Sequence, residues 1–131
     1  MRDGNVTKMR ASDGATLATF GVGQWPISMA FDGANIWISG GWPPNFVTKL
    51  RAADGVILGT FQTGAWYVAG VAYDGANIWV SDSDGDTVTK LGASDGVILG
   101  SFRAGPGPNS FAFDGANVWV ANMGNGTVSK M

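Results

Sequence analysis

The stretch Asp74-Gly75-Ala76-Asn77-Ile78-Trp79-Val80 is written three times, with little change, in this chain of 131 residues. The other copies start at Asp32 and Asp114, so the motifs lie 42 and 40 residues apart. An Asp-Gly pair followed by a β-branched and aromatic run is typical of a tight turn that leads into a strand. A strand-and-turn unit that recurs about every forty residues indicates the blade repeat of a β-propeller.

Two further series of similar segments run in phase with this motif. The first has four copies, spaced 41, 41 and 40 residues apart: Val6-Thr7-Lys8-Met9, Val47-Thr48-Lys49-Leu50, Val88-Thr89-Lys90-Leu91 and Val128-Ser129-Lys130-Met131. The second covers residues 15–20, 56–61 and 97–102. The copies are short and are bounded by Asp-Gly or glycine-rich turns, and nothing longer than a turn has helical periodicity. We therefore predict an all-β fold built from four-stranded antiparallel blades.

The order of the series predicts the strand order. With strands labelled a to d from the central axis outward, strand a covers residues 28–31, 70–73 and 110–113, where small side chains suit the crowded inner edge. The Ile/Val-Trp-Ile/Val core is strand b, the Val-Thr-Lys-Leu series strand c and the remaining series strand d. The order c-d, a-b-c-d, a-b-c-d, a-b-c gives a single propeller-repeat domain, residues 1–131, of about three blades. A β-sandwich does not explain a four-strand unit that repeats in phase.

Three blades are too few to close a ring, because propellers use four to eight blades and each blade packs both of its faces. Runs that are apolar on both faces likewise predict strands sandwiched between neighbouring blades. Alone, three blades would expose apolar faces and unpaired edges. We expect a self-assembling homo-oligomer, most simply a homodimer with six blades, next a homotrimer with nine. A designed chain, or a fragment of a longer propeller with no activity beyond assembly, is the alternative.

Composition excludes several classes of function. The chain has no cysteine, histidine or glutamate, which removes thiolate nucleophiles, imidazole bases and the usual zinc ligands. Six of the ten aspartates stand in repeated Asp-Gly turns, and the lysines recur once per repeat as solvent-facing strand residues would, so no basic stripe for nucleic acid exists. We find no signal peptide and no membrane span, and expect a soluble, by default cytoplasmic, chain.

These repeats resemble bacterial propellers of the streptogramin (virginiamycin B) lyase-like and YVTN/NHL-like type. The similarity rests on segments such as Phe31-Asp32-Gly33-Ala34-Asn35-Ile36-Trp37 and Val47-Thr48-Lys49-Leu50, and it extends over essentially the whole chain. The resemblance implies a propeller fold. In the lyase family the chemistry depends on a histidine base and a metal, and this chain has no histidine to take that role. We therefore predict a non-enzymatic module, with a lyase-like enzyme as the alternative.

Two kinds of connection vary between repeats, d to a and b to c, and both lie on one rim of the predicted ring. Variable loops on a constant scaffold are where a binding site is expected. Aromatic rings beside amide and guanidinium groups suit a carbohydrate or an extended peptide. The candidate ligand-binding residues are Gln24, Trp25, Trp42, Trp66, Tyr67, Arg103 and Asn122. The alternative is that the tryptophans among them only pack between blades, as Trp37, Trp79 and Trp119 of strand b are expected to do.

Asp82, Asp84 and Asp86 form the one cluster of carboxylates in the sequence. Hard oxygen ligands that alternate on a tight loop could hold calcium, by partial analogy to Asp-rich calcium loops. The pattern lacks a downstream glutamate and occurs in one repeat, so a solvated turn is the simpler interpretation. Apart from this weak calcium site, we expect no cofactor.

Overall fold

The computed structural model describes residues 4–23, 25–40 and 45–131, and every regular element in these ranges is a β-strand. The strands are β1 (Gly4–Met9), β2 (Thr16–Gly23), β3 (Pro26–Phe31), β4 (Asn35–Gly40), β5 (Phe46–Arg51), β6 (Ile57–Gln62), β7 (Val68–Tyr73), β8 (Asn77–Asp82), β9 (Thr87–Gly92), β10 (Ile98–Arg103), β11 (Pro108–Phe113), β12 (Val118–Asn122) and β13 (Thr127–Lys130). None of the described residues forms a helix long and apolar enough to cross a membrane.

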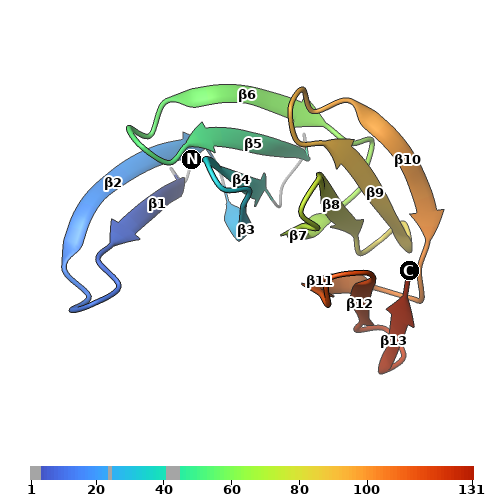
Figure 1. The fold of residues 1–131 in the computed structure, drawn as a ribbon. Coiled ribbons are helices and arrows are strands. Elements are labelled where there is room, and N and C mark those ends of the chain that lie inside the picture. Colours follow the sequence, from blue (N-terminus) through green and yellow to red (C-terminus); the bar gives the residue numbers. More distant parts are fainter. Residues whose placement is uncertain (1–3, 24, 41–44) are drawn as a thin grey trace.

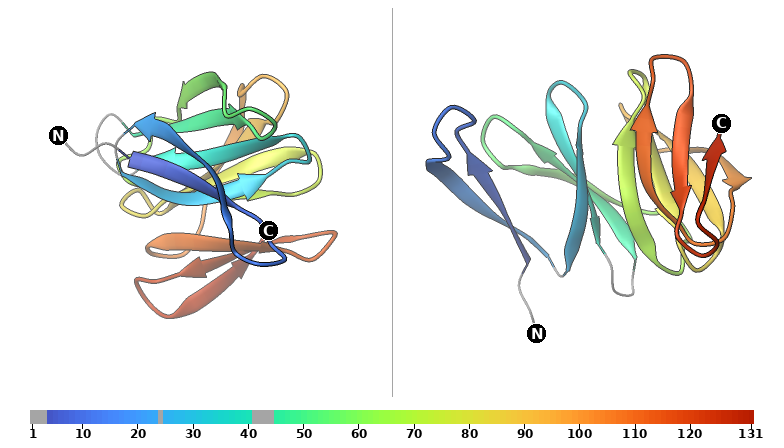
Figure 2. Two further views of the ribbon diagram at one scale, coloured as in Figure 1. Left: turned by 90° about the vertical axis from the view of Figure 1, so that its left-hand side faces the viewer. Right: turned by 90° about the horizontal axis from the view of Figure 1, so that it is seen from below.

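The strands form four antiparallel sheets that follow the chain in order: β1-β2, β3-β4-β5-β6, β7-β8-β9-β10 and β11-β12-β13. The sheets fan out around a common axis (Figure 1), with β3, β7 and β11 innermost and β2, β6 and β10 outermost. A gap separates the first sheet from the last (Figures 1 and 2), so the fan is open. The predicted all-β fold of antiparallel blades is confirmed, although each innermost strand begins two residues earlier than the sequence pattern indicated.

The repeated Asp-Gly-Ala-Asn turn is held by its aspartate. In the second copy, Oδ1 of Asp74 accepts hydrogen bonds from the amides of Ala76 and Asn77, at 2.9 and 2.7 Å. Oδ2 accepts one from Nε1 of Trp79 at 2.7 Å, and Asp32 and Asp114 bind Trp37 and Trp119 in the same way at 2.8 Å. The motif is therefore a single unit that fixes both the turn and the indole of strand b.

These hydrogen bonds set the pKa of the turn aspartates. Burial opposes ionisation at Asp32 and Asp74, but the indole and backbone N–H donors outweigh it, so each pKa lies below its ordinary value. At Asp114 the hydrogen bond from Trp119 is the largest cause, and the pKa is again lowered. The carboxylates thus stay ionised and keep accepting hydrogen bonds down to acid pH.

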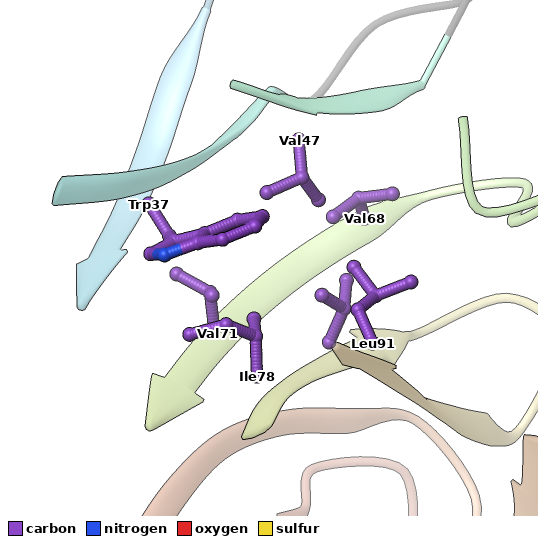
Figure 3. Packing of buried hydrophobic residues seen from close by; sticks show 7 residues of the cluster. Trp37, Val47, Val68, Val71, Ile78 and Leu91 are labelled. Carbon is purple, nitrogen blue, oxygen red and sulfur yellow. The ribbon is translucent and has the colours of Figure 1, made fainter. Parts of the chain in front are cut away.

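The core lies between neighbouring blades. The largest cluster fills the space between the β3–β6 and β7–β10 sheets (Figure 3), and its buried members are Trp37, Val47, Val68, Val71, Ile78, Val80 and Leu91. A smaller cluster of four buried residues, including Trp79 and Val120, joins the third sheet to the fourth. Val22, Ile38 and Leu50 join the first to the second. Packing therefore thins toward both ends of the fan.

The strand c lysines are not simply solvent-facing, as the sequence pattern had indicated. Nζ of Lys49 lies 5.2 Å from the ring centroid of Trp37 and donates a 2.9 Å hydrogen bond to the carbonyl of Ala93 in the next blade. Lys8 donates similarly to Ala52 of the following blade at 3.2 Å. Each of these lysines therefore links two blades.

The outermost strands differ from the expectation that all apolar runs are sandwiched between blades. Along β6 and β10, the side chains of Ile57, Leu58, Ile98 and Leu99 are exposed, because they lie at the circumference of the fan, where successive blades diverge. A two-sided apolar pattern therefore predicted the strands correctly but overstated the burial of strand d.

Candidate functional site

A hollow of about 480 Å³ lies where the innermost strands begin, and its walls come from the variable loops. It is lined by Ile27, Tyr67, Ala69, Ser83, Asp84, Asn109 and Met123. These residues come from three successive blades: β3, the loop before β7 and β7 itself, the loop after β8, β11, and the loop after β12. A mixed apolar and polar lining is typical of small-molecule binding sites.

Hydrogen bonds within and between blades hold these loops together. The backbone amide of Ser83 donates to the carbonyl of Tyr67 at 3.0 Å, and Oγ of Ser83 donates to the carbonyl of Pro108 in the next blade at 2.7 Å. Nδ2 of Asn109 lies 3.5 Å from Sδ of Met123. The loops are thus cross-linked to neighbouring strands, which gives the hollow a fixed frame.

The aromatic pair beside the hollow is positioned by a buried carboxylate. Oδ2 of Asp82 accepts a 3.1 Å hydrogen bond from the amide of Trp66, and Oδ1 accepts one of 3.0 Å from the amide of Tyr67. Asp82 thus fixes both amides, while Trp66 is 77% exposed and Tyr67 is 39% exposed. The aspartate therefore presents two aromatic rings to solvent.

The geometry of the other acidic residues in this loop bears on the predicted calcium site. Oδ1 of Asp82 also accepts a hydrogen bond from the amide of Asp84, and Oδ1 of Asp86 accepts one from the amide of Gly107 at 2.9 Å. No three acidic, cysteine or histidine side chains in the described ranges converge in a way that could hold a metal ion. Calcium binding here stays a prediction for a titration to decide.

Trp25, Arg103 and Asn122, three further predicted ligand residues, are not among the residues that line the hollow. Gln24 and Trp42 fall outside the described residues. Trp25 precedes β3 and is about half exposed, whereas Arg103 ends β10 on the outside of its blade. Asn122 is only 2% exposed, and its Nδ2 donates to Oγ1 of Thr127 and Oγ of Ser129 within the last blade.

The comparison of the repeats pointed to the rim on which the hollow lies, but it did not indicate all of the residues that line the hollow. Ile27 and Ala69 occupy equivalent positions near the start of strand a, and Met123 lies in a variable loop. Their apolar character signalled packing rather than a surface. The first residues of the three copies of strand a must converge at the axis of a propeller, and this rule could have identified them.

A second hollow, of about 320 Å³, lies between the first two sheets, and we call it the junction cavity. Its lining is mainly apolar: Val6, Phe20, Met29, Phe31, Ile36 and Leu50. The first sheet has only the outer strands β1 and β2, and on the neighbouring β3 the side chains of Met29 and Phe31 are more than half exposed. The cavity therefore lies beside the position that strands a and b occupy in the four-stranded blades.

Comparison with known proteins gives the fold alone. No protein-family model matches the chain, and no curated protein matches it. Among solved structures, the chain superposes on the WD40 repeats of RRP9 with a TM-score of 0.81 at 16% identity, covering 98% of this chain and 44% of that one. The fold is a β-propeller fold.

Two further solved structures extend the comparison. A functionally unknown protein from Desulfotomaculum acetoxidans DSM 771 gives a TM-score of 0.80 at 16% identity, with 96% of this chain and 44% of that chain covered. BamB from Moraxella catarrhalis gives 0.73 at 14% identity, with 97% and 37% covered. The chain thus spans less than half the length of each of these neighbours, and such low identity transfers no activity.

Proposed function

We propose that this chain is a non-enzymatic β-propeller module that completes its ring by association with copies of itself, most simply a second copy giving six blades. The observation that carries the proposal is that its two end sheets are complementary. The first supplies strands c and d without a and b, and the last supplies a, b and c without d. Each end therefore holds what the other end requires.

The exposed side chains on the two end faces support association. Met29 on β3 is 55% exposed, whereas its repeat equivalent Val71 on β7 is 7% exposed in the covered interface. On the other end, Trp119 of β12 is 36% exposed, whereas its repeat equivalent Trp37 is fully buried. Apolar side chains that are exposed at an end of the fan, at positions that a neighbouring blade covers elsewhere, favour burial against a partner.

The test is sedimentation velocity of the purified chain over a concentration series. We expect a reversible shift from one to two chain masses, accompanied by a rise in melting temperature, because association and folding are then linked. Three chain masses would establish the nine-bladed ring instead. A monomer over the whole series would overturn the proposal.

For the rim we propose a recognition surface built on the hollow beside Tyr67. Aromatic faces, the amide of Asn109 and the flexible thioether of Met123 suit a carbohydrate or an extended peptide. Glycan and peptide arrays probed with the chain, then with Tyr67→Ala and with the circumference control Leu99→Ala, test this surface. A ligand lost only in Tyr67→Ala supports it, and a ligand retained by that variant contradicts it.

The lyase-like alternative is tested by turnover. The only observation in its favour is the likeness of the repeats, and the chain lacks the histidine that this chemistry uses in that family. Metal-dependent opening of a cyclic ester substrate by the purified chain would overturn the non-enzymatic assignment.

A further inference from the structure

We infer that, at each junction of the assembled ring, strand β1 of one copy replaces β13 on the edge of β12 of the other copy. The junction blade is then β11-β12 from one chain followed by the partner's β1 and β2. The inference rests on the proposed self-association, but it goes further by naming the strand that leaves and the register that forms. A ring made from two such chains has four-stranded blades throughout, with β13 released at both junctions.

The repeats fix the register. Lys8 of β1 and Lys130 of β13 occupy the same repeat position, as do Val6 and Val128. In the isolated chain Trp119 pairs with Lys130 and Ala121 with Val128. On exchange, Trp119 therefore pairs with the partner's Lys8 and Ala121 with the partner's Val6.

The strand exchange would supply an aromatic contact that Trp119 lacks among the residues described for the isolated chain. Trp37 stacks on Phe61 of the outermost strand of its blade at 5.6 Å, and Trp79 lies 5.7 Å from Phe102 in the same relation. Trp119 has no such ring partner in the described part of the chain, which holds no outer strand in that sheet. Phe20 of β2 is the repeat equivalent of Phe61, and it lines the junction cavity.

The same exchange fills the junction cavity. Trp37 lies against Val71 of the following blade (Figure 3), whose repeat equivalent is the exposed Met29. Bringing β12 to the edge of the partner's β1 places Trp119 over the partner's Met29 in the corresponding relation. One movement thus covers the open faces of both chains.

The strand pairings of β1 and β13 indicate which of these two strand c copies is displaced on assembly. β1 pairs with β2 over six residue pairs, and the turn between them is held by an Arg10–Asp13 ion pair and by the carboxylate of Asp13 on the Ala15 amide. β13 pairs with β12 over four residue pairs and has no strand on its outer edge within the described residues. Removing β13 therefore breaks fewer contacts than removing β1 from β2.

A cysteine pair tests the register directly, because the chain has no cysteine of its own. Val118 and Met131 exchange both backbone hydrogen bonds, so the neighbouring non-hydrogen-bonded pairs include Ala121–Val128. Such pairs bring Cα atoms to about 4.5 Å, which suits a disulfide. The exchange variant is Val6→Cys with Ala121→Cys, and the matched lock is Ala121→Cys with Val128→Cys.

The oxidised exchange variant is expected to run at twice the chain mass on a non-reducing gel. The variants with a single cysteine are expected to run at the mass of one chain. The oxidised lock is expected to lose association in sedimentation, and reduction is expected to restore it. A lock that still associates while the exchange variant does not cross-link would overturn the strand exchange and leave self-association standing. If the unsubstituted chain itself fails to associate, the proposed function falls with it.

Discussion

The covered interface between the β3–β6 and β7–β10 sheets differs sharply from the open face at β12, although the same repeat builds both. Trp37 is fully buried and Trp79 is 8% exposed, but Trp119 is 36% exposed with the same hydrogen bond to its turn aspartate. The motif therefore fixes the conformation of the indole, whereas a neighbouring blade buries it. Burial in this fold depends on position in the array and is not a property of the repeat.

The largest effect is expected from removing an indole in the covered interface. Trp37→Ala should lower the free energy of unfolding by about 3–5 kcal/mol, because it empties the centre of the main core cluster. Trp119→Ala is the matched control and should cost less in dilute solution. Denaturant unfolding at several protein concentrations checks both, and equal losses at every concentration would contradict the contrast between the two regions.

The next effect concerns the turn carboxylate. Asp74→Ala removes the acceptor for two backbone amides and the Trp79 indole, and we expect a loss of about 1–3 kcal/mol in unfolding free energy. Urea unfolding at neutral pH measures it. A loss no greater than that from the exposed substitution Leu99→Ala would show that the unit does not stabilise the blade.

The same carboxylates predict acid sensitivity. Because the folded-state pKa values of Asp32, Asp74 and Asp114 lie below the unfolded value of about 3.9, their stabilisation is complete above roughly pH 4. It is lost as pH falls through the folded pKa values. Unfolding free energy should therefore drop below pH 4, with a shallower slope in Asp74→Asn, and an unchanged slope in that variant would refute the assignment.

A smaller effect is expected from adding a hydrogen-bond donor to the open face at β12. Oγ of Ser39 donates to the carbonyl of Ala69 in the next blade at 2.8 Å, and Ser81 donates similarly to Asn109 at 3.3 Å. Ala121 holds this position in the last blade and has no hydroxyl. Ala121→Ser should form the bond to the partner's Ile27 carbonyl and tighten association by about 1 kcal/mol, roughly fivefold.

Sedimentation equilibrium of Ala121→Ser and of the unsubstituted chain measures that gain. Ala121→Gly serves as the control, since it changes the side chain without adding a hydroxyl. Equal association constants for the serine variant and the unsubstituted chain would mean that β12 does not face the partner's β3 in the assembly.

The smallest effect is expected from replacing the strand c lysines, and it should differ between Lys49 and Lys8. Lys49→Met removes the ammonium from the Trp37 ring and from the Ala93 carbonyl, and should cost about 1 kcal/mol. Lys8→Met loses a carbonyl contact but no contact with an indole among the described residues. Its cost should be smaller in the monomer and rise on association, which thermal melts at low and high concentration would detect.

Much of this fold could be predicted from the sequence, because each blade is encoded locally. The Asp-Gly turns, the β-branched runs and the Trp of strand b appear in order, so strand number and succession follow from periodicity. The sequence did not reveal that the turn aspartate binds the indole, because that contact depends on side-chain direction rather than spacing. The exposed strand d residues were missed since divergence of the blades is a property of the whole fan.

The candidate site was less predictable than the fold. Tyr67 could be placed on the variable rim, but the hollow beside it is lined by Ile27, Ala69 and Met123, which carry no chemical signal of their own. The carboxylate of Asp82 holds the amides of Trp66 and Tyr67, a role that its place in an Asp-rich loop did not indicate. Loop geometry from three blades decides such a site, and no single repeat contains it.

The central claim is that the two open faces cover one another. Oxidative footprinting of Met29 and Trp119 as a function of concentration tests it most directly, with the exposed rim residues Met123 and Trp66 as internal controls. The account predicts that Met29 and Trp119 become protected together as the chain mass doubles, while the rim residues stay reactive. Doubling of the mass with Met29 and Trp119 still reactive would contradict it.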